Sequence, residues 1–351
     1  MTFHVVLPRA MRLADGALLA DSGEAPRHAM WMLAQRLEAT IHEPSDHEGV
    51  VVPSDRLRAK LLPSRSLWSL ARLVCAKTGP RDVIFCSSEA GGLQLAAVAG
   101  ASRQRARLAV FVHNVDRPRG RLALRLWKMA NTVDLFLACS NRQVEFLRRY
   151  LRLEPHRVLH VWDHTDTRFF TPGPPSPEKP RRTIVSVGLE KRDYRTLAAA
   201  THDLDVDVRI SGFSKDAAAM AQTFPDPLPA NMTRGFYAWR DLVQLYRDAD
   251  VVVVSCCPNP YAAGVQSLME AMACRRPVIA TATEGLQDYL DDSVRLVSPG
   301  DASGMRMAIL ESLQNTDQSE SRARRGFELA LQRYDIERYV RHVAALLEAM
   351  A

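Results

Sequence analysis

The fold is decided by the stretch Asp250-Val-Val-Val-Val-Ser-Cys-Cys-Pro-Asn-Pro-Tyr-Ala-Ala-Gly-Val-Gln-Ser-Leu-Met-Glu-Ala-Met-Ala-Cys-Arg-Arg-Pro-Val-Ile-Ala-Thr281. Residues 251–254 form an apolar β-branched run, which is typical of a strand buried on both faces. From Val265 onward apolar residues recur at three- and four-residue spacing, whereas Gln266 and Glu270 share another face, and this predicts an amphipathic helix. Residues 278–280 then begin a second strand. The stretch therefore predicts a strand, a loop, a helix and a strand.

The loop of residues 256–264 occupies the position where such a sheet binds ligands. In an open parallel sheet, ligands bind at the carboxyl ends of the strands, and a helix N-terminus presents free N–H groups to a phosphate there. The alternative is an ordinary buried strand-helix-strand unit in which Glu270 is a solvated or capping carboxylate. Periodicity alone leaves both interpretations open.

The same residues resemble the nucleotide-sugar site of GT-B glycosyltransferases, in particular the family 4-like group (glycosyltransferase group 1). The matching segments are Gly264-Val265-Gln266 and Glu270-Ala-Met-Ala-Cys-Arg-Arg-Pro-Val-Ile-Ala280. The resemblance implies that Gly264, Val265 and Gln266 bind the donor and that Glu270 holds its ribose hydroxyls. An acidic residue eight positions before this glutamate is common in the family, but Ala262 stands there in this chain.

A second donor-binding segment follows the strand predicted at residues 184–187. Members of the family have a Gly-Arg pair and then a Lys a few residues later, and both cations bind the donor diphosphate. Here Gly188 is followed by Leu, and the nearest cations are Lys191 and Arg192. The resemblance implies that one of these two cations stabilises the charge on the departing diphosphate. The alternative is a capped helix start at Asp193.

In the first half of the chain, the apolar strand predicted at residues 108–112 ends at His113. In the family, a strand of the first domain ends in a histidine directed at the donor sugar and the acceptor, so His113 is the predicted catalytic histidine. Asn114, Arg117 and Arg119 follow it and are weaker candidates for acceptor or phosphate binding. The alternatives are a structural histidine and a solvated loop.

The positive charge of the chain lies in its first half. Residues 1–170 contain 25 Lys and Arg against 16 Asp and Glu, and residues 171–351 contain 21 against 24, so the halves carry +9 and −3 of the total of +6. A basic half suits an anionic membrane surface or an acidic substrate. Residues 64–77 form a basic amphipathic helix that either lies on anionic lipid or packs into the core.

Composition excludes several other classes of protein. With 47% hydrophobic and 25% charged residues the chain is typical of a globular protein, and no apolar run is long enough to cross a bilayer. The N-terminus lacks a signal-peptide pattern, so we expect a cytoplasmic protein, with peripheral contact at the inner membrane surface as a further option. The six cysteines have no metal-ligand spacing, the Asp203-Leu-Asp-Val-Asp207 run precedes a strand instead of following one, and no nucleic-acid module is present, so no metal, cofactor or nucleic acid is expected.

These observations predict an α/β chain of two Rossmann-like, doubly wound domains that face a cleft, as in the GT-B fold. The predicted parts are an acceptor-binding domain at residues 1–172, a proline-rich linker at 173–182, a nucleotide-sugar domain at 183–334, and a last helix at 335–351 that crosses back to the first domain. Residues 8–25 are expected to form an irregular loop before a helix at 27–39.

The resemblance implies a metal-independent, retaining glycosyltransferase of the hexosyltransferase type. It would move a sugar from a UDP- or GDP-sugar to a polysaccharide, glycolipid or small-molecule acceptor. Two other functions remain open. One is a nucleotide-sugar epimerase or a phosphorylase of related architecture, and the other is a non-catalytic nucleotide-sugar-binding or scaffold subunit.

Overall fold

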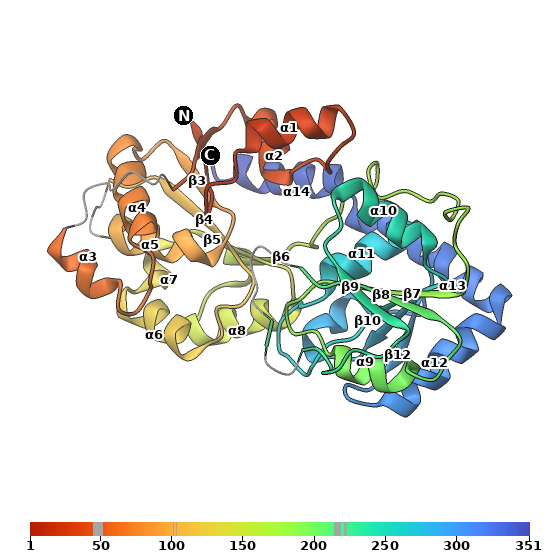
Figure 1. Cartoon of the computed structure of the whole chain (residues 1–351). Coiled ribbons are helices and arrows are strands. Elements are labelled where there is room, and N and C mark those ends of the chain that lie inside the picture. The colour runs from red at the N-terminus through yellow and green to blue at the C-terminus, as the bar shows by residue number, and fades with distance from the viewer. Residues whose placement is uncertain (45–51, 101, 103, 214–218, 221–222) are drawn as a thin grey trace. The chain divides into compact units, whose positions relative to one another are not determined.

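The computed structural model describes residues 1–44, 52–100, 102, 104–213, 219–220 and 223–351 and divides the chain into two compact units (Figure 1). The first unit comprises residues 1–18, 27–162 and 339–351, and the second comprises residues 19–26 and 163–338. Residues 173–182, predicted as a linker, thus fall in the second unit. The predicted domain bounds, and the acceptor-binding and donor-binding functions assigned to the two domains, stay predictions.

The first unit contains a six-stranded sheet in the order β2-β1-β3-β4-β5-β6, and all its neighbouring strands are parallel. The chain winds outward from β1 in both directions, which is the doubly wound arrangement. The register pairs Val6 with Cys86 and Cys86 with Val110, so the central strands end at one edge. The strands are β1 (Phe3–Val6), β2 (Thr40–His42), β3 (Val83–Cys86), β4 (Arg107–Val112), β5 (Leu135–Ala138) and β6 (Val158–His160).

Helix α4 of the first unit buries its apolar face against this sheet. The apolar side of α4, which includes Leu67, Trp68 and Val74, lies in one core cluster with Ile84 and Val110. Of the two interpretations of residues 64–77, core packing is therefore the one observed. The helices are α1 (Leu13–Asp21), α2 (Ala29–Leu37), α3 (Pro53–Arg58), α4 (Arg65–Lys77), α5 (Glu89–Ala99), α6 (Pro118–Leu126), α7 (Met129–Thr132), α8 (Asn141–Leu151), the 3₁₀ turn η1 (Pro155–Arg157) and α14 (Ile336–Glu348). Of α1 only the residues up to Leu18, and of α14 only those from Tyr339, belong to this unit.

One expectation for the N-terminal region is wrong. Residues 8–25 were expected to form an irregular loop, but Leu13–Asp21 are helix α1. Eight of its nine residues are Ala, Leu or Asp, and the alanines and leucines have high helix propensity that outweighs the cost of Gly16.

The second unit contains a parallel sheet in the order β12-β11-β10-β7-β8-β9. The predicted strand-helix-strand stretch is confirmed as β10, α11 and β11, and β10 and β7 lie side by side at the centre. The strands are β7 (Thr183–Val187), β8 (Asp207–Ser211), β9 (Met232–Gly235), β10 (Val251–Val254), β11 (Val278–Thr281) and β12 (Val294–Val297).

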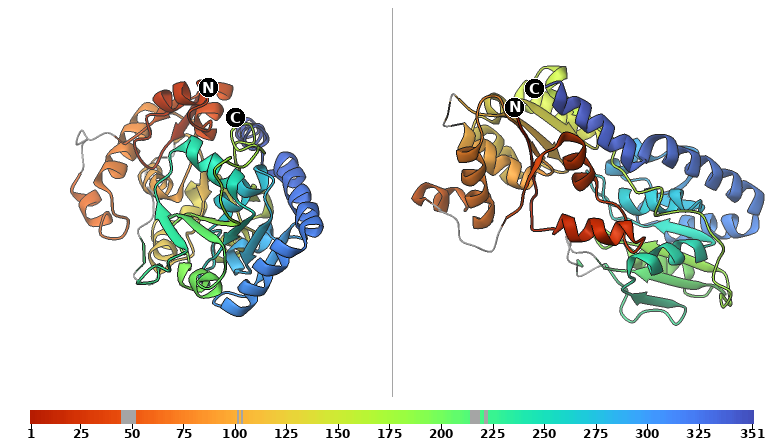
Figure 2. Two further views of the ribbon diagram at one scale, coloured as in Figure 1. Left: turned by 45° about the vertical axis from the view of Figure 1, so that its right-hand side comes forward. Right: turned by 90° about the horizontal axis from the view of Figure 1, so that it is seen from above.

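Helices flank this second sheet as well. Figure 2 shows the blue C-terminal helices, which include α12 and α13, along the outside of the second unit. The helices are α9 (Tyr194–Thr201), α10 (Trp239–Asp248), α11 (Val265–Ala273), α12 (Ala302–Gln314) and α13 (Thr316–Leu329), with the 3₁₀ turn η2 (Glu284–Tyr289) and the π turn η3 (Ala330–Tyr334). Among the described residues of both units, no helix is long and apolar enough to span a bilayer.

Candidate functional site

Two loops of the second unit are joined at the carboxyl edge of its sheet. They follow the neighbouring strands β7 and β10. The Asp193 N–H donates to the Ser255 carbonyl at 3.0 Å, and the Ser255 hydroxyl donates to the Asp193 carbonyl at 2.7 Å. The Cys257 N–H donates to the Lys191 carbonyl at 2.8 Å. The two sequence segments predicted to bind the donor are therefore brought together.

The guanidinium of Arg192 lies buried between these loops, with only 4% of the residue exposed. Its Nε and Nη2 donate to the Val187 carbonyl at 2.9 and 2.8 Å, and Nη1 donates to the Glu190 carbonyl at 3.0 Å. Nη1 also contacts Cys256 Sγ at 3.4 Å, and Nη2 donates to Ser267 Oγ at 2.8 Å. A guanidinium has five N–H donors, so protein atoms accept all of them.

Arg192 and Lys191 were predicted as alternative cations for the donor diphosphate, and the structure places them differently. Because every N–H of Arg192 is used inside the fold, a direct contact with a diphosphate would have to break one of these bonds. Lys191 is partly exposed and adopts a left-handed backbone with φ of 55°. Its ammonium makes no hydrogen bond or ion pair with the described residues. The geometry thus leaves Lys191 as the available cation.

Two glycines make room for the Arg192 guanidinium. Gly188 has φ of 107°, and a Cβ on it would lie 2.4 Å from Arg192 Nη2. Gly264 has φ of 97°, and a Cβ on it would lie 2.8 Å from Val254 Cγ1 and 3.4 Å from Arg192 Nη1. Both positions combine a left-handed backbone with close contact, and glycine alone meets both conditions without strain.

Helix α11 begins directly after Gly264 and points its N-terminus toward the loop region. The Val265 N–H donates to the Ala262 carbonyl at 3.2 Å. The N–H groups of Gln266 and Ser267 have no backbone acceptor among the described residues. Free N–H groups and the positive end of the helix dipole favour an anion at this place.

Glu270 lies one turn further along α11 and is 5% exposed. Its Oε2 accepts a hydrogen bond from the Tyr246 hydroxyl at 2.7 Å, and Oε1 accepts one from Gln266 Nε2 at 3.1 Å. Burial raises the pKa of Glu270 to about 7, although both hydrogen bonds and the charge of Arg192 act in the opposite direction. Glu270 is thus neither a solvated carboxylate nor a cap, and it titrates near neutral pH.

Two further features of this site were missed or undervalued from sequence. The amphipathic pattern of α10 indicates that Tyr246 is buried, but nothing in it indicates Glu270 as its partner.

The second feature is a pair of exposed aromatic rings. Phe213 and Phe236, which follow β8 and β9, are 49% and 69% exposed, and their rings meet edge to face at 5.0 Å. The Ser211 carbonyl, two residues before Phe213, accepts the Gly188 N–H at 2.9 Å. The segment that carries Phe213 is therefore bonded to the start of the loop after β7.

In the first unit, His113 follows β4 and its side chain is half exposed. The Glu89 carboxylate accepts hydrogen bonds from the backbone N–H of His113 at 2.9 Å and of Asn114 at 3.0 Å, and it lies 3.3 Å from His113 Nδ1. Burial alone would raise the pKa of Glu89, but these bonds and the charge of His113 lower it to about 2. Sequence reasoning missed Glu89, although its place after β3 puts it at the same sheet edge as His113.

The weaker candidates of the first unit differ in exposure. Asn114 is buried, and with its amide oxygen turned toward Arg117 it accepts from Nε and Nη2 at 2.9 and 2.6 Å. Arg119 is exposed. Asn114 and Arg117 share one loop with His113, and Arg119 lies in the first turn of α6, whereas Lys191 and Glu270 belong to the other unit.

The acidic run that could suggest a metal is engaged elsewhere. Asp203 pairs with Arg306, and Asp205 and Asp207 both pair with Arg181 at 3.1 Å. Among the described residues, no cluster of three His, Cys, Asp or Glu side chains has the arrangement of a metal site.

Comparison with known proteins agrees with this geometry. Residues 192–315, which include α11 and Glu270, match the family described as "Glycosyl transferases group 1". The chain also resembles solved structures along nearly its whole length. Sucrose-phosphate synthase from Thermosynechococcus elongatus is 15% identical, with 100% of this chain and 99% of that chain covered and a TM-score of 0.73.

Two further structures extend this likeness. The HepE protein of Anabaena, in complex with UDP-glucose, is 15% identical with a TM-score of 0.70, and 99% of this chain and 100% of that one are covered. A trehalose-phosphate synthase from Burkholderia xenovorans, in complex with glucose-6-phosphate, is 14% identical over 99% and 100% of the two chains, with a TM-score of 0.68. No curated protein matches the chain by sequence.

The prediction of a glycosyltransferase with two doubly wound domains is thereby confirmed. Each unit contains one six-stranded parallel sheet, and the family match falls within the second unit, in which the predicted donor loops lie. Residues 192–315 match the group 1 glycosyltransferases, and the whole chain shares the fold of these solved structures.

Proposed function

We propose that this chain transfers a hexose from a nucleoside diphosphate sugar to an acceptor, and that the second unit binds the donor. The observation that carries the proposal is the pair of loops fixed by buried Arg192 beside the N-terminus of α11 and Glu270. This arrangement offers free N–H groups, one available ammonium and one buried carboxyl within two neighbouring loops and a helix. The N–H groups and the ammonium suit the negative charge of a diphosphate, and the carboxyl suits the hydroxyls of a ribose.

Each group has a distinct role in the proposed reaction. The ammonium of Lys191 and the N–H groups of Gln266 and Ser267 would stabilise the negative charge that develops on the departing diphosphate. The carboxyl of Glu270 would accept hydrogen bonds from the ribose hydroxyls. The exposed ring of Phe236 would stack on the base. These groups supply positive charge without a metal, so we propose a metal-independent transfer.

In the first unit, we propose that His113 contacts the transferred sugar or the acceptor, with Asn114, Arg117 and Arg119 as neighbouring acceptor contacts. Retention at the anomeric carbon is proposed from the family resemblance. UDP is the proposed nucleotide because the similar HepE structures contain UDP-glucose or UDP. The acceptor is proposed to be a sugar, a lipid-linked sugar or a small molecule.

A second candidate is a subunit that binds a nucleotide sugar without turnover. The observation that favours it is Ala262, which stands where many family members have a carboxylate. An epimerase is the third candidate, since it would use the same donor loops with different chemistry.

The first experiment is thermal unfolding of the purified chain with UDP-, GDP- and ADP-sugars and with the free nucleotides. A ligand at about 100 times its Kd stabilises the folded state by about 2.7 kcal/mol. We expect a shift with UDP and UDP-sugars that is lost in Glu270→Gln and kept in Met307→Ala, an exposed residue on α12. The absence of any shift would contradict the donor site.

Turnover then separates the candidates. We expect release of UDP that depends on an added sugar acceptor and is lost in His113→Ala. Donor binding without release in the presence of any acceptor would support the binding subunit, and a change of the sugar without an acceptor would support the epimerase.

Peripheral contact with an anionic membrane from the cytoplasmic side is also proposed, and it is argued below from the surface of α6.

A further inference from the structure

Helix α6 of the first unit has apolar side chains on two sides. Ala123 and Leu124 are buried against the unit, as the inner face of a surface helix should be. Leu122 and Leu126, however, are 53% and 60% exposed. An outer face normally carries polar residues, so two exposed leucines one turn apart make this face unusually apolar.

Basic residues surround the two leucines. No Asp or Glu occurs from residue 117 to residue 133, and this segment contains four arginines and one lysine. Arg119, Arg125 and Lys128 are exposed and have no carboxylate partner among the described residues. The outer face of α6 is therefore both apolar and cationic, which is the pattern of helices that lie in a membrane interface.

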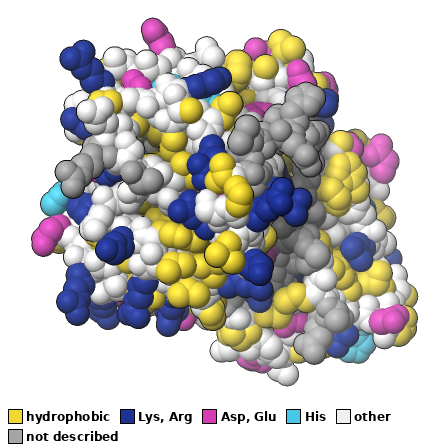
Figure 3. Space-filling view, turned by 90° about the vertical axis from the view of Figure 1, so that its left-hand side faces the viewer, with side chains coloured by type: hydrophobic (Ala, Val, Ile, Leu, Met, Phe, Trp, Pro, Cys, Tyr) yellow, Lys and Arg dark blue, Asp and Glu magenta, His cyan; other side chains and the backbone are white. Residues whose placement is uncertain are grey.

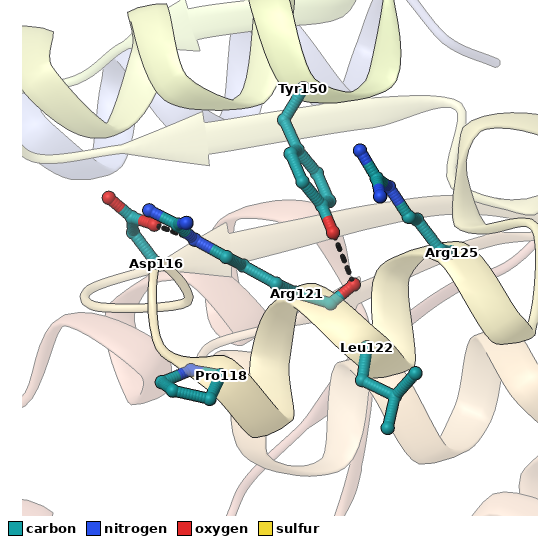
Figure 4. Close-up of a pocket in the computed structure, with 6 residues that line it drawn as sticks. All are labelled: Asp116, Pro118, Arg121, Leu122, Arg125 and Tyr150. Carbon is teal, nitrogen blue, oxygen red and sulfur yellow. Dashed lines mark hydrogen bonds and ion pairs between the residues drawn. The ribbon is translucent and has the colours of Figure 1, made fainter.

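A shallow hollow adjoins this face (Figure 4). The guanidinium of Arg125 lies 4.3 Å from the ring centre of Tyr150, and the Tyr150 hydroxyl donates to the Arg121 carbonyl at 3.0 Å. The single acid of the hollow, Asp116, is neutralised by Arg121 at 2.5 Å and Arg142 at 3.3 Å. The hollow is lined by Asp116, Pro118, Arg121, Leu122, Arg125 and Tyr150.

The apolar surface continues beyond α6. The half-buried ring of Trp127, which follows α6, packs edge to face on the buried Trp68 of α4 at 5.7 Å, and Arg58 at the end of α3 lies 5.8 Å from the Trp68 ring, so the core lies directly beneath this surface. Leu57 of α3 is 68% exposed. Figure 3 shows this side of the molecule, with a continuous hydrophobic area bordered by a row of Lys and Arg side chains.

We propose that α6 docks the first unit onto an anionic lipid bilayer. Arg125 and Lys128 contact headgroup phosphates, and Leu122 and Leu126 enter the boundary between headgroups and acyl chains. Charge complementarity selects an anionic partner, and the exposed leucines select a bilayer over a soluble phosphate or a nucleic acid, which would gain nothing from them. This surface is separate from the helix of residues 64–77, whose apolar side is core.

The test is co-sedimentation of the full chain with vesicles of phosphatidylcholine alone or mixed with phosphatidylglycerol. We expect binding to the mixed vesicles that weakens with added salt, and little binding to phosphatidylcholine. Arg125→Gln should lower the partition coefficient about five-fold, the effect of one cation near such a surface. The double variant Leu122→Ser and Leu126→Ser should lower it about ten-fold or more.

The matched controls lie in the second unit. Arg324→Gln and Met307→Ser change an exposed arginine and an exposed apolar residue there and should leave partitioning unchanged. Thermal unfolding and UDP binding of every variant show whether it is folded, and they separate failure here from failure of the proposed function. Equal binding to both vesicle types, no binding at low salt, full binding by the leucine variant, or complete competition by inorganic phosphate or RNA would each overturn the proposal.

Discussion

The Arg192 guanidinium donates a hydrogen bond to the Ser267 hydroxyl at 2.8 Å, and this bond ties the first turn of α11 to the loop after β7. The Ser267 hydroxyl in turn donates to the Gly264 carbonyl at 3.0 Å. A residue that resembles a ligand contact in the sequence thus holds the backbone of the proposed donor site in place. Since its bonded partners are carbonyls, a hydroxyl and a thiol, its charge also adds to the positive potential at the helix N-terminus.

Replacement of Arg192 by Gln should destabilise the protein by about 3 kcal/mol, because the buried carbonyls of Val187 and Glu190 lose their donors. Thermal or urea unfolding measures this effect. Arg324→Gln is the control for loss of one positive charge and should stay within about 0.5 kcal/mol. An Arg192→Gln protein as stable as the parent would show that these bonds do not hold the loops together.

Replacement of Lys191 by Gln should lower UDP affinity and leave stability unchanged, in contrast to the loss of stability expected for Arg192→Gln. We expect unchanged stability, because the ammonium contacts no described residue, and UDP affinity lower by about ten-fold or more, because a charge-assisted hydrogen bond contributes about 1.5–3 kcal/mol. Isothermal titration with UDP and with uridine checks it, since uridine lacks the diphosphate and its affinity should not change. An equal loss for both ligands would contradict the assignment of Lys191 to the diphosphate.

The pKa of Glu270, raised to about 7, predicts a pH dependence of donor binding. An ionised carboxylate is the better acceptor for ribose hydroxyls, so UDP affinity should rise as the pH increases from 6 to 8, by up to about ten-fold per pH unit below the pKa. In Glu270→Gln, affinity should be low and nearly independent of pH. A parallel rise in both proteins would assign the titration to another group.

The same residue affects stability with a definite sign. Its pKa is higher in the folded than in the unfolded chain, where it is close to 4.5, so the folded state binds more protons between those values. Stability should therefore fall as the pH rises from about 4.5 to 7. Glu270→Gln should remove this slope, and the difference from the parent protein should be largest above pH 7.

Local sequence patterns predicted the second unit well. The buried run before the loop, the glycine at its end and the polar edge of α11 are all local signals, and the structure places them as expected. The roles of Lys191 and Arg192 could not be separated, because adjacent residues in a loop point in directions set by backbone dihedrals, here the positive φ of Lys191. Tyr246 and Glu89 were missed for another reason. Their partners lie 24 or 25 residues away, and no local pattern encodes a tertiary pair.

Replacement of Glu89 by Gln tests the first unit. The Glu89 carboxylate accepts the N–H groups of His113 and Asn114, and its pKa is lowered to about 2, so it stabilises the fold above about pH 4.5 and loses this effect as the pH falls toward 2. At pH 7, Glu89→Gln should cost about 1–3 kcal/mol, and the difference from the parent should shrink at low pH.

The same variant shows whether His113 acts on the reaction or only on the fold. If Glu89 positions a catalytic His113, Glu89→Gln should lower kcat for glycosyl transfer several-fold while KM for the donor, which we propose the second unit binds, stays unchanged. His113→Ala should lower kcat further, and the double variant should be no slower than His113→Ala alone because both changes act through one side chain. Effects of the two substitutions on kcat that simply multiply would show that Glu89 acts independently of His113.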